Sequence, residues 1–210
     1  MTMINSNWHS LVSTQMKLTR IPRRLLEAAE LVPIRSTQTL CRKGDAVRGI
    51  FFVLTGEVRL VRRDTNGREI VLHRARSGFI AEASLGAKCY HCDLVAAEKG
   101  SLVRFPVYAF REALREDALF RDAWTTQLAI EVMKVRTQCE RLGLHSAADR
   151  ISHYIETEGK DGIIILTQSR KAWAAELGLT HEALYRALRR LQDDGMLLID
   201  GDRIALRNPK

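Results

Sequence analysis

The sequence predicts an α+β protein: a rolled antiparallel sheet, then a long helix, then a small helical domain that ends in a β-hairpin. Three observations predict this order. Between residues 36 and 106, short runs of β-branched and aromatic residues alternate with glycine-containing turns. Residues 118 to 142 contain neither Gly nor Pro and carry apolar side chains at helical spacing. From residue 169 onward, two short helical patterns precede two short strand patterns.

Composition indicates a cytoplasmic chain. Hydrophobic residues make up 46% of the 210 residues, which is enough to form the cores of two small domains. No stretch approaches the roughly 20 consecutive apolar residues of a membrane span. The N-terminus has no apolar run behind a basic start, which argues against a secretory signal. We therefore expect a cytoplasmic protein without membrane contact.

The first 116 residues are expected to form an N-terminal arm and a β-roll. Residues 1–20 show weak periodicity and are assigned to the arm, and residues 21–116 are assigned to the roll. The roll begins with a short helix that opens at Pro22 and closes at Pro33. Asn66-Gly67 between alternating strands is a strong hairpin signal. Many short strands with glycine turns indicate a barrel or roll. The expected strands cover residues 39–41, 50–54, 58–61, 69–72, 94–96 and 102–105.

This region offers no arrangement for catalysis. It has no Gly-rich phosphate loop before a helix, no Ser/His/Asp set and no paired carboxylates in a catalytic pattern. A thiol oxidoreductase using Cys89 and Cys92 would need a strand–C-x-x-C–helix context, which the surrounding residues do not give. We therefore expect a protein that is not an enzyme.

Residues 117–143 are expected to form a long dimerisation helix. Its apolar side chains repeat at spacings of 4, 3, 4 and 3, which is the pattern of a coiled-coil seam. The seam consists of Leu128, Val132, Val135, Cys139 and Leu142. Such a seam packs against a partner helix, and the alternative is a stripe that packs on the chain's own β-roll. Gly143 is a natural hinge after this helix, and Ser146 is the expected N-cap of the next one.

Residues 144–210 are expected to form the C-terminal domain, centred on a pair of short helices. Ser169 and Thr180 are the expected N-caps of the two helices, and Gly178 is suited to end the first. The second helix has an apolar side made by leucines at spacings of 4 and 3, namely Leu184, Leu188 and Leu191. Strands at residues 196–199 and 204–206 then form a hairpin.

The opposite side of the second helix suits the DNA major groove. Arg can bond guanine bidentately, Glu can accept from cytosine, and Tyr or His can reach a base edge or a phosphate. The outward residues are His181, Glu182, Tyr185, Arg186 and Arg189. Thr180, Ser169 and Arg170 are expected to contact phosphates. The alternative is an ordinary helix pair with a solvated charged face.

The net charge of +8 does not by itself locate a nucleic-acid interface. From Gly143 onward, basic and acidic residues are equal in number, so the whole excess lies in the first two thirds of the chain. The pattern of residues indicates DNA binding, whereas the N-terminal excess could face DNA flanks, face an acidic effector or serve solubility.

Two sets of motifs occur together, in order, along roughly residues 20 to 207. The C-terminal set is Leu166-Thr-Gln-Ser, Ala175-Glu-Leu-Gly-Leu-Thr180, Glu182-Ala-Leu-Tyr-Arg186 and Asp194-Gly-Met-Leu197. The N-terminal set is Gly44-Asp45, Phe52-Val-Leu-Thr-Gly-Glu-Val58, Gly67-Arg-Glu-Ile-Val-Leu72 and Phe79-Ile-Ala-Glu82. Both resemble the Crp/Fnr superfamily of bacterial transcription regulators. The resemblance implies a cyclic-nucleotide-binding-like β-roll and a winged helix-turn-helix. It also implies that the long helix at residues 117–143 pairs with its twin in a homodimer.

The resemblance also gives a test for cyclic AMP. The family holds the nucleotide with a Gly-Glu…Arg-Ser/Thr cassette, in which Arg binds the phosphate. Glu82 matches the Glu, but Ala81 replaces the Gly, and the Arg falls at Cys92 if the loop has its usual length. Val135 stands near the position of an adenine-contacting hydroxyl. A thiol cannot replace a guanidinium, so cyclic AMP is disfavoured as the effector.

Cysteines occupy the place of the expected phosphate ligands. Cys89 and Cys92 form a C-x-x-C that could close a disulfide or bind a thiophilic metal or metalloid ion, with Cys41 and His91 as further ligands. The alternatives are buried structural thiols, haem or another small organic ligand. An iron–sulfur cluster is disfavoured, because family members with one carry its cysteines near the N-terminus and residues 1–35 contain none.

We therefore predict a homodimeric, sequence-specific DNA-binding transcription regulator whose β-roll senses a signal other than cyclic AMP. Its expected partners are double-stranded DNA with a palindromic operator, a second copy of the chain and, for an activator, RNA polymerase. The alternative is a β-roll thiol protein whose winged helix binds protein rather than DNA.

Overall fold

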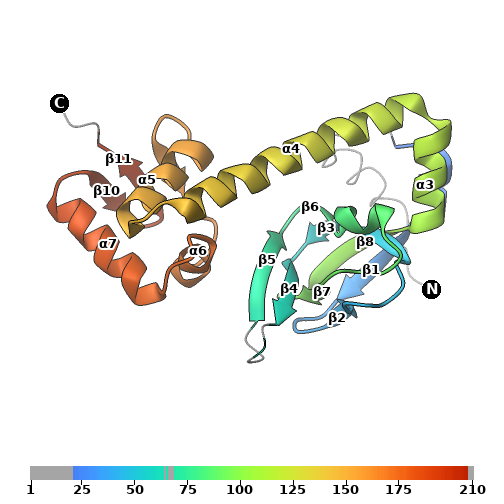
Figure 1. Ribbon diagram of the computed structural model, residues 1–210, viewed down its shortest axis with the longest axis horizontal. Helices are drawn as coiled ribbons and strands as arrows, with labels where there is room; N and C mark the ends of the chain where they lie inside the picture. Colours follow the sequence, from blue (N-terminus) through green and yellow to red (C-terminus); the bar gives the residue numbers. More distant parts are fainter. Residues whose placement is uncertain (1–20, 64, 66–68, 208–210) are drawn as a thin grey trace. The chain divides into compact units, whose positions relative to one another are not determined.

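The computed structural model describes residues 21–63, 65 and 69–207. The chain divides into two compact units, with the division between Gln127 and Leu128 (Figure 1). The long helix α4 (Ala118–Gly143) contributes residues to both units. Each unit is described separately below.

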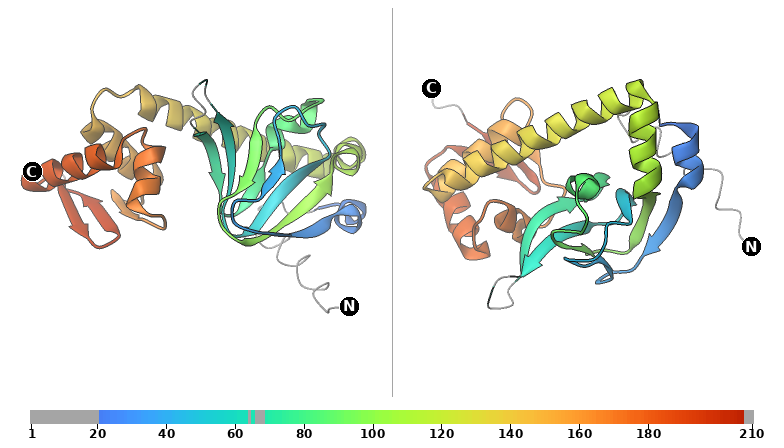
Figure 2. Two further views of the ribbon diagram at one scale, coloured as in Figure 1. Left: turned by 90° about the horizontal axis from the view of Figure 1, so that it is seen from below. Right: turned by 45° about the vertical axis from the view of Figure 1, so that its right-hand side comes forward.

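The first unit contains two four-stranded antiparallel sheets. One sheet has the order β1 (Glu30–Ile34), β8 (Gly100–Pro106), β3 (Gly49–Thr55) and β6 (Gly78–Ile80). The other has the order β2 (Thr39–Cys41), β7 (Asp93–Ala96), β4 (Val58–Arg63) and β5 (Glu69–Ala75). Their strands curve around a common interior (Figure 2). Apolar residues from both sheets fill it, including Phe51 and Leu102 from the first and Leu60 and Leu94 from the second.

Aromatic side chains attach the helices of this unit to the first sheet. Helices α2 (Arg23–Ala28) and α3 (Val107–Glu116) flank the roll, and a 3₁₀ turn, η1 (Glu82–Gly86), follows β6. The Phe110 ring of α3 lies 4.7 Å from the Trp124 ring of α4 and 5.5 Å from the Phe120 ring, measured between centroids. Trp124 also meets Phe79 at 4.8 Å. Edge-to-face contacts of this kind bury large apolar area, so the start of α4 is fixed to the roll.

The N-terminal helix is shorter than the sequence predicts. It ends at Ala28, and Pro33 lies in strand β1 opposite Ser101 instead of closing the helix. The strand β1 is at the edge of its sheet, where Pro is tolerated because one side needs no amide donor. The expected arm at residues 1–20 and the Asn66-Gly67 turn lie outside the described residues.

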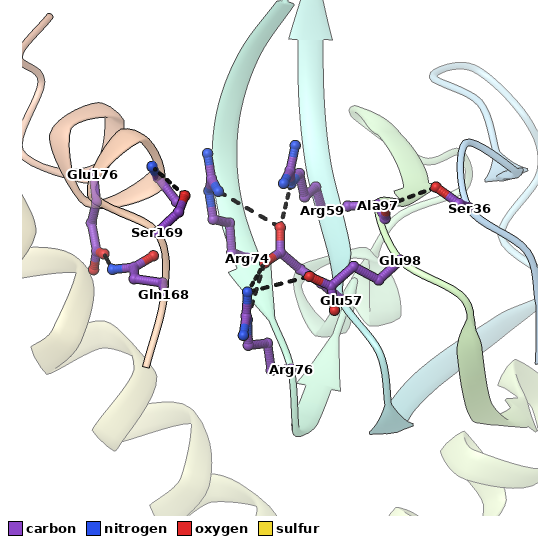
Figure 3. Close-up of polar contacts among 11 residues, drawn as sticks. Ser36, Glu57, Arg59, Arg74, Arg76, Ala97, Glu98, Gln168, Ser169 and Glu176 are labelled. Atoms are coloured by element: carbon purple, nitrogen blue, oxygen red, sulfur yellow. Dashed lines mark hydrogen bonds and ion pairs between the residues drawn. The ribbon is translucent and has the colours of Figure 1, made fainter. Parts of the chain in front are cut away.

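A buried carboxylate holds three arginines at one end of β4 and β5 (Figure 3). Glu57 is 2% exposed and accepts hydrogen bonds from Nε of Arg59 and of Arg76. Arg74 Nη1 lies 3.6 Å from Glu57 Oε1, and Arg76 also reaches Glu98. Burial alone would raise the pKa of Glu57, but the arginines outweigh it and hold that pKa below its ordinary value.

The second unit is a small helical domain with a three-stranded sheet. Its helices are α5 (Ala147–Glu158), α6 (Arg170–Glu176) and α7 (His181–Asp193). Its sheet has the order β10 (Leu197–Asp200), β11 (Arg203–Leu206) and β9 (Ile163–Ile165). Trp173 lies fully buried at the centre of a single apolar cluster that takes residues from all six elements. The predicted fold class, a β-roll with a long helix and a winged helix-turn-helix, is confirmed.

Among the residues that the structure describes, no helix combines the length and the apolar character needed to cross a membrane.

Candidate functional site

Helix α7 presents a polar face that is supported from below by leucines. Leu184, Leu188 and Leu191 are buried, as their spacing predicts. The predicted outward residues are all exposed on the other side, namely His181, Glu182, Tyr185, Arg186 and Arg189. A helix held in this way keeps its backbone fixed while its outer side chains stay accessible.

The start of α7 is set by a cap and a tight turn. Thr180 Oγ1 accepts a hydrogen bond from the amide of Ala183 at 3.1 Å, so the predicted N-cap is present. Gly178 has a φ of +65°, the left-handed conformation expected of a helix-ending glycine. A Cβ at Gly178 would stand 2.8 Å from Leu142 Cδ2, so the turn also has no space for a side chain.

The outer side chains of α7 are arranged in two groups. His181 and Tyr185 pack edge to face with ring centroids 4.6 Å apart, which orients both rings at the N-terminal end of the helix. Arg189 lies 4.0 Å from Asp193, one turn further along. The side chains of Glu182 and Arg186 are exposed and make no side-chain contact within the described part of the chain, so their polar groups are available to a ligand.

Two of the predicted phosphate contacts lie at the start of α6. Ser169 caps that helix by accepting from the Ala172 amide at 3.2 Å, as the sequence predicts (Figure 3). Arg170 donates from Nη2 to the carbonyl of Gly201 at 2.8 Å. The guanidinium therefore ties α6 to the turn of the β10–β11 hairpin, a contact that the sequence did not indicate.

The loop after β6 is where the family cassette would hold a nucleotide. Ala81 is buried and has a φ of 67°, a left-handed conformation that the family's Gly adopts without strain. Its carbonyl accepts from the Ser84 amide at 3.0 Å, and Glu82 begins the 3₁₀ turn. The backbone of the cassette is thus formed with Ala in place of Gly.

Comparison with known proteins identifies the fold. A family model described as the cyclic nucleotide-binding domain matches residues 31–117. The structure of FixK2 from Bradyrhizobium japonicum is 22% identical, with a TM-score of 0.65 over 86% of this chain and 93% of that one. The c-di-GMP responsive regulator CLP of Xanthomonas campestris is also 22% identical, with a TM-score of 0.62 over 89% of this chain and 97% of that one.

A third solved structure agrees. A putative cAMP-binding regulatory protein from Silicibacter pomeroyi is 20% identical, with a TM-score of 0.59 over 95% of this chain and 93% of that one. The chain shares the fold of these proteins. The resemblance to Crp/Fnr regulators read from the motifs is confirmed for the fold. A comparison with curated protein sequences gave no match.

In this Crp/Fnr fold the two cysteines of the C-x-x-C differ in environment. Cys89 is exposed, whereas Cys92 is 2% exposed. Cys92 instead shares an apolar cluster with Cys41, which pairs with Leu94 across the β2–β7 ladder. All four cysteines are free thiols. The structure therefore groups Cys92 with Cys41 rather than with its sequence neighbour Cys89.

The two buried thiols lose their protons less readily than an ordinary cysteine does. Burial, followed by the charges of Cys92 and Asp45, raises the pKa of Cys41 to about 12. Burial also raises the pKa of Cys92, although Arg62 partly opposes this. Within the described residues, no group of three or more His, Cys, Asp or Glu side chains is placed to hold a metal ion. The proposed ligand set of Cys41, Cys89, His91 and Cys92 is thus not assembled in this conformation.

Sequence reasoning missed two side chains that organise the Cys89–Cys92 loop. Tyr90 is buried, and its hydroxyl donates to the Gly49 carbonyl at 2.8 Å and accepts from the Gly49 amide at 3.1 Å. Arg62 of β4 donates to the carbonyl of His91 from both Nε and Nη2. The sequence could have indicated Tyr90, since an aromatic residue between two cysteines suggests a buried side chain. It could not have indicated the Arg62 contact, because that contact depends on how the strands pair.

The predicted dimer seam faces outward in the second unit. Val132, Val135 and Leu142 expose 49%, 61% and 43% of their surface. Cys139 is also exposed, and Leu128 is half-buried. An apolar stripe of this kind is available for a partner helix. Val135, named as an effector-pocket position, is one of its most exposed members.

Proposed function

We propose that this chain is a homodimeric, sequence-specific DNA-binding transcription regulator. The observation that carries the proposal is the exposed set His181, Glu182, Tyr185 and Arg186 at the start of α7, backed by three buried leucines. In a helix-turn-helix, this end of the second helix meets base edges. The fold supports DNA as the partner, since its structural neighbour CLP of Xanthomonas campestris is a c-di-GMP responsive global regulator that links cell-cell signalling to virulence gene expression.

Selection of binding sites from random double-stranded DNA tests the proposal. We expect the full chain to enrich a palindrome and to bind it with a steep salt dependence, since phosphate contacts release counterions. Arg186→Ala should cost about 1–3 kcal/mol and relax the preference at one base position. Arg115→Ala, which removes the same charge from an exposed position on α3, is the matched control and should bind as wild type does.

Failure to enrich any sequence would refute sequence-specific binding. Weak binding with no change in Arg186→Ala would favour the alternative, in which the winged helix binds a protein partner. The two outcomes are separable, because phosphate contacts give DNA binding a steep fall of log affinity with log salt concentration, and a domain that binds only protein gives no such binding to DNA.

We further propose that the β-roll responds to a signal other than cyclic AMP. The support is chemical. If the loop has its usual length, the Arg of the family cassette falls at the buried Cys92 and its Ser/Thr neighbour falls at Asp93, and neither side chain can bind a phosphate as the family's residues do. The thiol or thiophilic-ion hypothesis requires Cys41, Cys89, His91 and Cys92 to come together from different environments. It therefore requires a rearrangement of the Cys89–Cys92 loop.

A small organic effector is the second candidate, because the β-roll contains a cavity. The cavity has a volume of about 470 Å³, within the usual range for small ligands. Its floor includes Phe51, Leu102 and Cys41, and Arg48 and Arg104 line it as well. Metal analysis and a free-thiol count on protein purified without chelator or oxidant separate the candidates. Stoichiometric metal with protection of the exposed Cys89 supports the ion, and four thiols that titrate after unfolding, without metal, support the organic ligand or a redox switch.

A further inference from the structure

A buried guanidinium bonds the last turn of α4 to α5. Arg141 is 1% exposed, and its Nη2 donates to Thr157 Oγ1 and to Glu158 Oε1, both at 2.8 Å. Its Nη1 donates to Gln138 Oε1 at 2.7 Å. The guanidinium carbon also lies 4.6 Å from the centre of the Tyr154 ring. Only arginine can make this planar, forked and stacked set of contacts.

A second set of contacts joins the same segment to the helix-turn-helix. Gln138 Nε2 donates to the carbonyl of Glu176, the last residue of α6, at 2.6 Å. The Glu176 carboxylate in turn accepts from Gln168 (Figure 3). Arg150 of α5 donates to the carbonyl of Leu144 at 2.9 Å and to that of Leu177 at 3.2 Å. The segment after α4 is thereby held against the turn between α6 and α7.

Packing agrees with the hydrogen bonds. The side chain of Leu142 fills the space beside Gly178, where a Cβ would stand only 2.8 Å from Leu142 Cδ2. The Arg141 guanidinium stacks on the Tyr154 ring, and this ring also packs against the buried Trp173 ring, with centroids 5.6 Å apart. Arg141 is therefore connected through one aromatic ring to the centre of the domain core.

These contacts bear on Gly143, the hinge that the sequence suggests. Helix α4 continues through Gly143, and the residues on both sides of it are bonded to α5 or to the helix-turn-helix. Rotation at Gly143 would break the bonds of Arg141 and leave its charge buried without partners, which is strongly unfavourable.

We infer that Arg141, with Gln138 and Arg150, is a positioning residue that makes the end of α4 and the winged helix a single rigid body. In such a rigid body, the orientation of α7 follows the orientation of the end of α4. The consequence for DNA binding rests on the proposed function. In a dimer joined through α4, such a joint fixes the distance and the rotation between the two recognition helices. The protein should then accept only one spacing of operator half-sites.

The test compares wild type with Arg141→Met on a series of DNA duplexes whose half-site spacing varies by single base pairs. Each added base pair rotates one half-site by about 36°, so we expect wild-type affinity to fall at least about 10-fold one base pair from the optimum. Arg141→Met should flatten this profile while binding the best spacing within a few-fold. Methionine fills the same volume, and Glu158 is 47% exposed, so no buried charge is left unpaired.

Gln138→Met is the second variant, and Arg115→Met is the matched control with an unchanged profile. Hydrogen exchange at the amide of Leu144, which donates to the Arg141 carbonyl, gives a readout without DNA. We expect exchange at this amide to accelerate about 10-fold or more in Arg141→Met at an unchanged melting temperature. A merely structural role would lower the melting temperature and reduce affinity equally at all spacings.

An unchanged spacing profile together with a protected Leu144 amide in both variants would overturn the inference. If wild type selects no DNA sequence, the proposed function fails, and the exchange rates alone then decide whether the joint is rigid. The two failures are therefore distinguishable.

Discussion

Glu57 makes the β-roll sensitive to acid, because one buried carboxylate balances three guanidinium groups. Its pKa is held below the ordinary value of 4.5 by Arg59, Arg76 and Arg74, against the opposing effect of burial. A lowered carboxyl pKa contributes stability that is complete above the ordinary pKa. That stability is lost as the pH falls through the lowered value.

Glu57→Gln should therefore destabilise the protein at neutral pH by about 2–3 kcal/mol, since the arginines lose their counter-charge but stay partly solvated. The variant should also lose less stability than wild type between pH 5 and pH 3. Urea unfolding at both pH values measures the effect. Glu98→Gln is the control, because Glu98 is half exposed and makes one long contact, 3.4 Å to Arg76. Equal losses in the two variants would contradict the assignment.

The cysteines should separate into two reactivity classes. At pH 7–8 the exposed Cys89 should react rapidly with a thiol reagent, whereas Cys41 and Cys92 should react only after unfolding. Cys139 is exposed in the single chain but lies on the proposed dimer seam, so it should react slowly in the dimer. Cys89→Ser should remove one rapid equivalent. Four thiols of equal reactivity in the folded protein would show that the Cys89–Cys92 loop opens readily.

The raised pKa of Cys41 predicts that the folded protein loses stability at alkaline pH. The folded protein keeps the Cys41 proton up to about pH 12, whereas the unfolded chain loses it near the ordinary value of 9.0. Stability should therefore fall as the pH rises above 9. Cys41→Ala should show a smaller fall in urea unfolding over the same range.

At the scale of elements, the helices of the second unit are defined by local signals. Thr180 caps α7, so Thr180→Ala should lower the free energy of unfolding by about 1 kcal/mol, while Thr180→Ser should be nearly neutral. Thermal unfolding measures both variants. A loss as large in Thr180→Ser as in Thr180→Ala would mean that the hydroxyl does not cap the helix.

Local signals explain what the sequence could predict. The caps at Ser146, Ser169 and Thr180 and the apolar side of α7 all depend on residues within one or two turns. Most strands of the roll were predicted for the same reason. The strands β1, β6 and β9 were missed. Pro33 hides the strand pattern of β1, and β6 and β9 have only three residues each, which is too short to show one.

Contacts between distant residues explain what the sequence could not predict. Arg141 near a helix C-terminus looks like an ordinary solvated cation, and its burial depends on α5 lying across it. The separation of Cys89 from Cys92 depends in the same way on the pairing of β2 with β7. The outward residues of α7 were predicted because one helical period places them, but their ligand is still a proposal.

At the scale of the whole molecule, the apolar stripe on α4 predicts a dimer. Val132→Glu should convert the protein to a monomer and abolish tight binding to a palindrome, since it places a charge on the seam. Light scattering during gel filtration gives the mass. Ile130→Glu is the matched control, because Ile130 is also exposed on α4 but lies outside the 4-3 repeat. A dimeric Val132→Glu would mean that the copies associate through another surface.

The burial of Cys92 limits what a single substitution at this position could achieve. One nucleotide change converts a cysteine codon into an arginine codon, and arginine at this position is what the family resemblance associates with nucleotide binding. In this fold, however, residue 92 lies in the apolar cluster beside Cys41 and Leu94. A guanidinium there would replace a small buried thiol in a close-packed interior and would displace neighbouring apolar side chains. A Cys92→Arg change alone is therefore not enough to form a phosphate site, because the interior of the β-roll must first be reshaped.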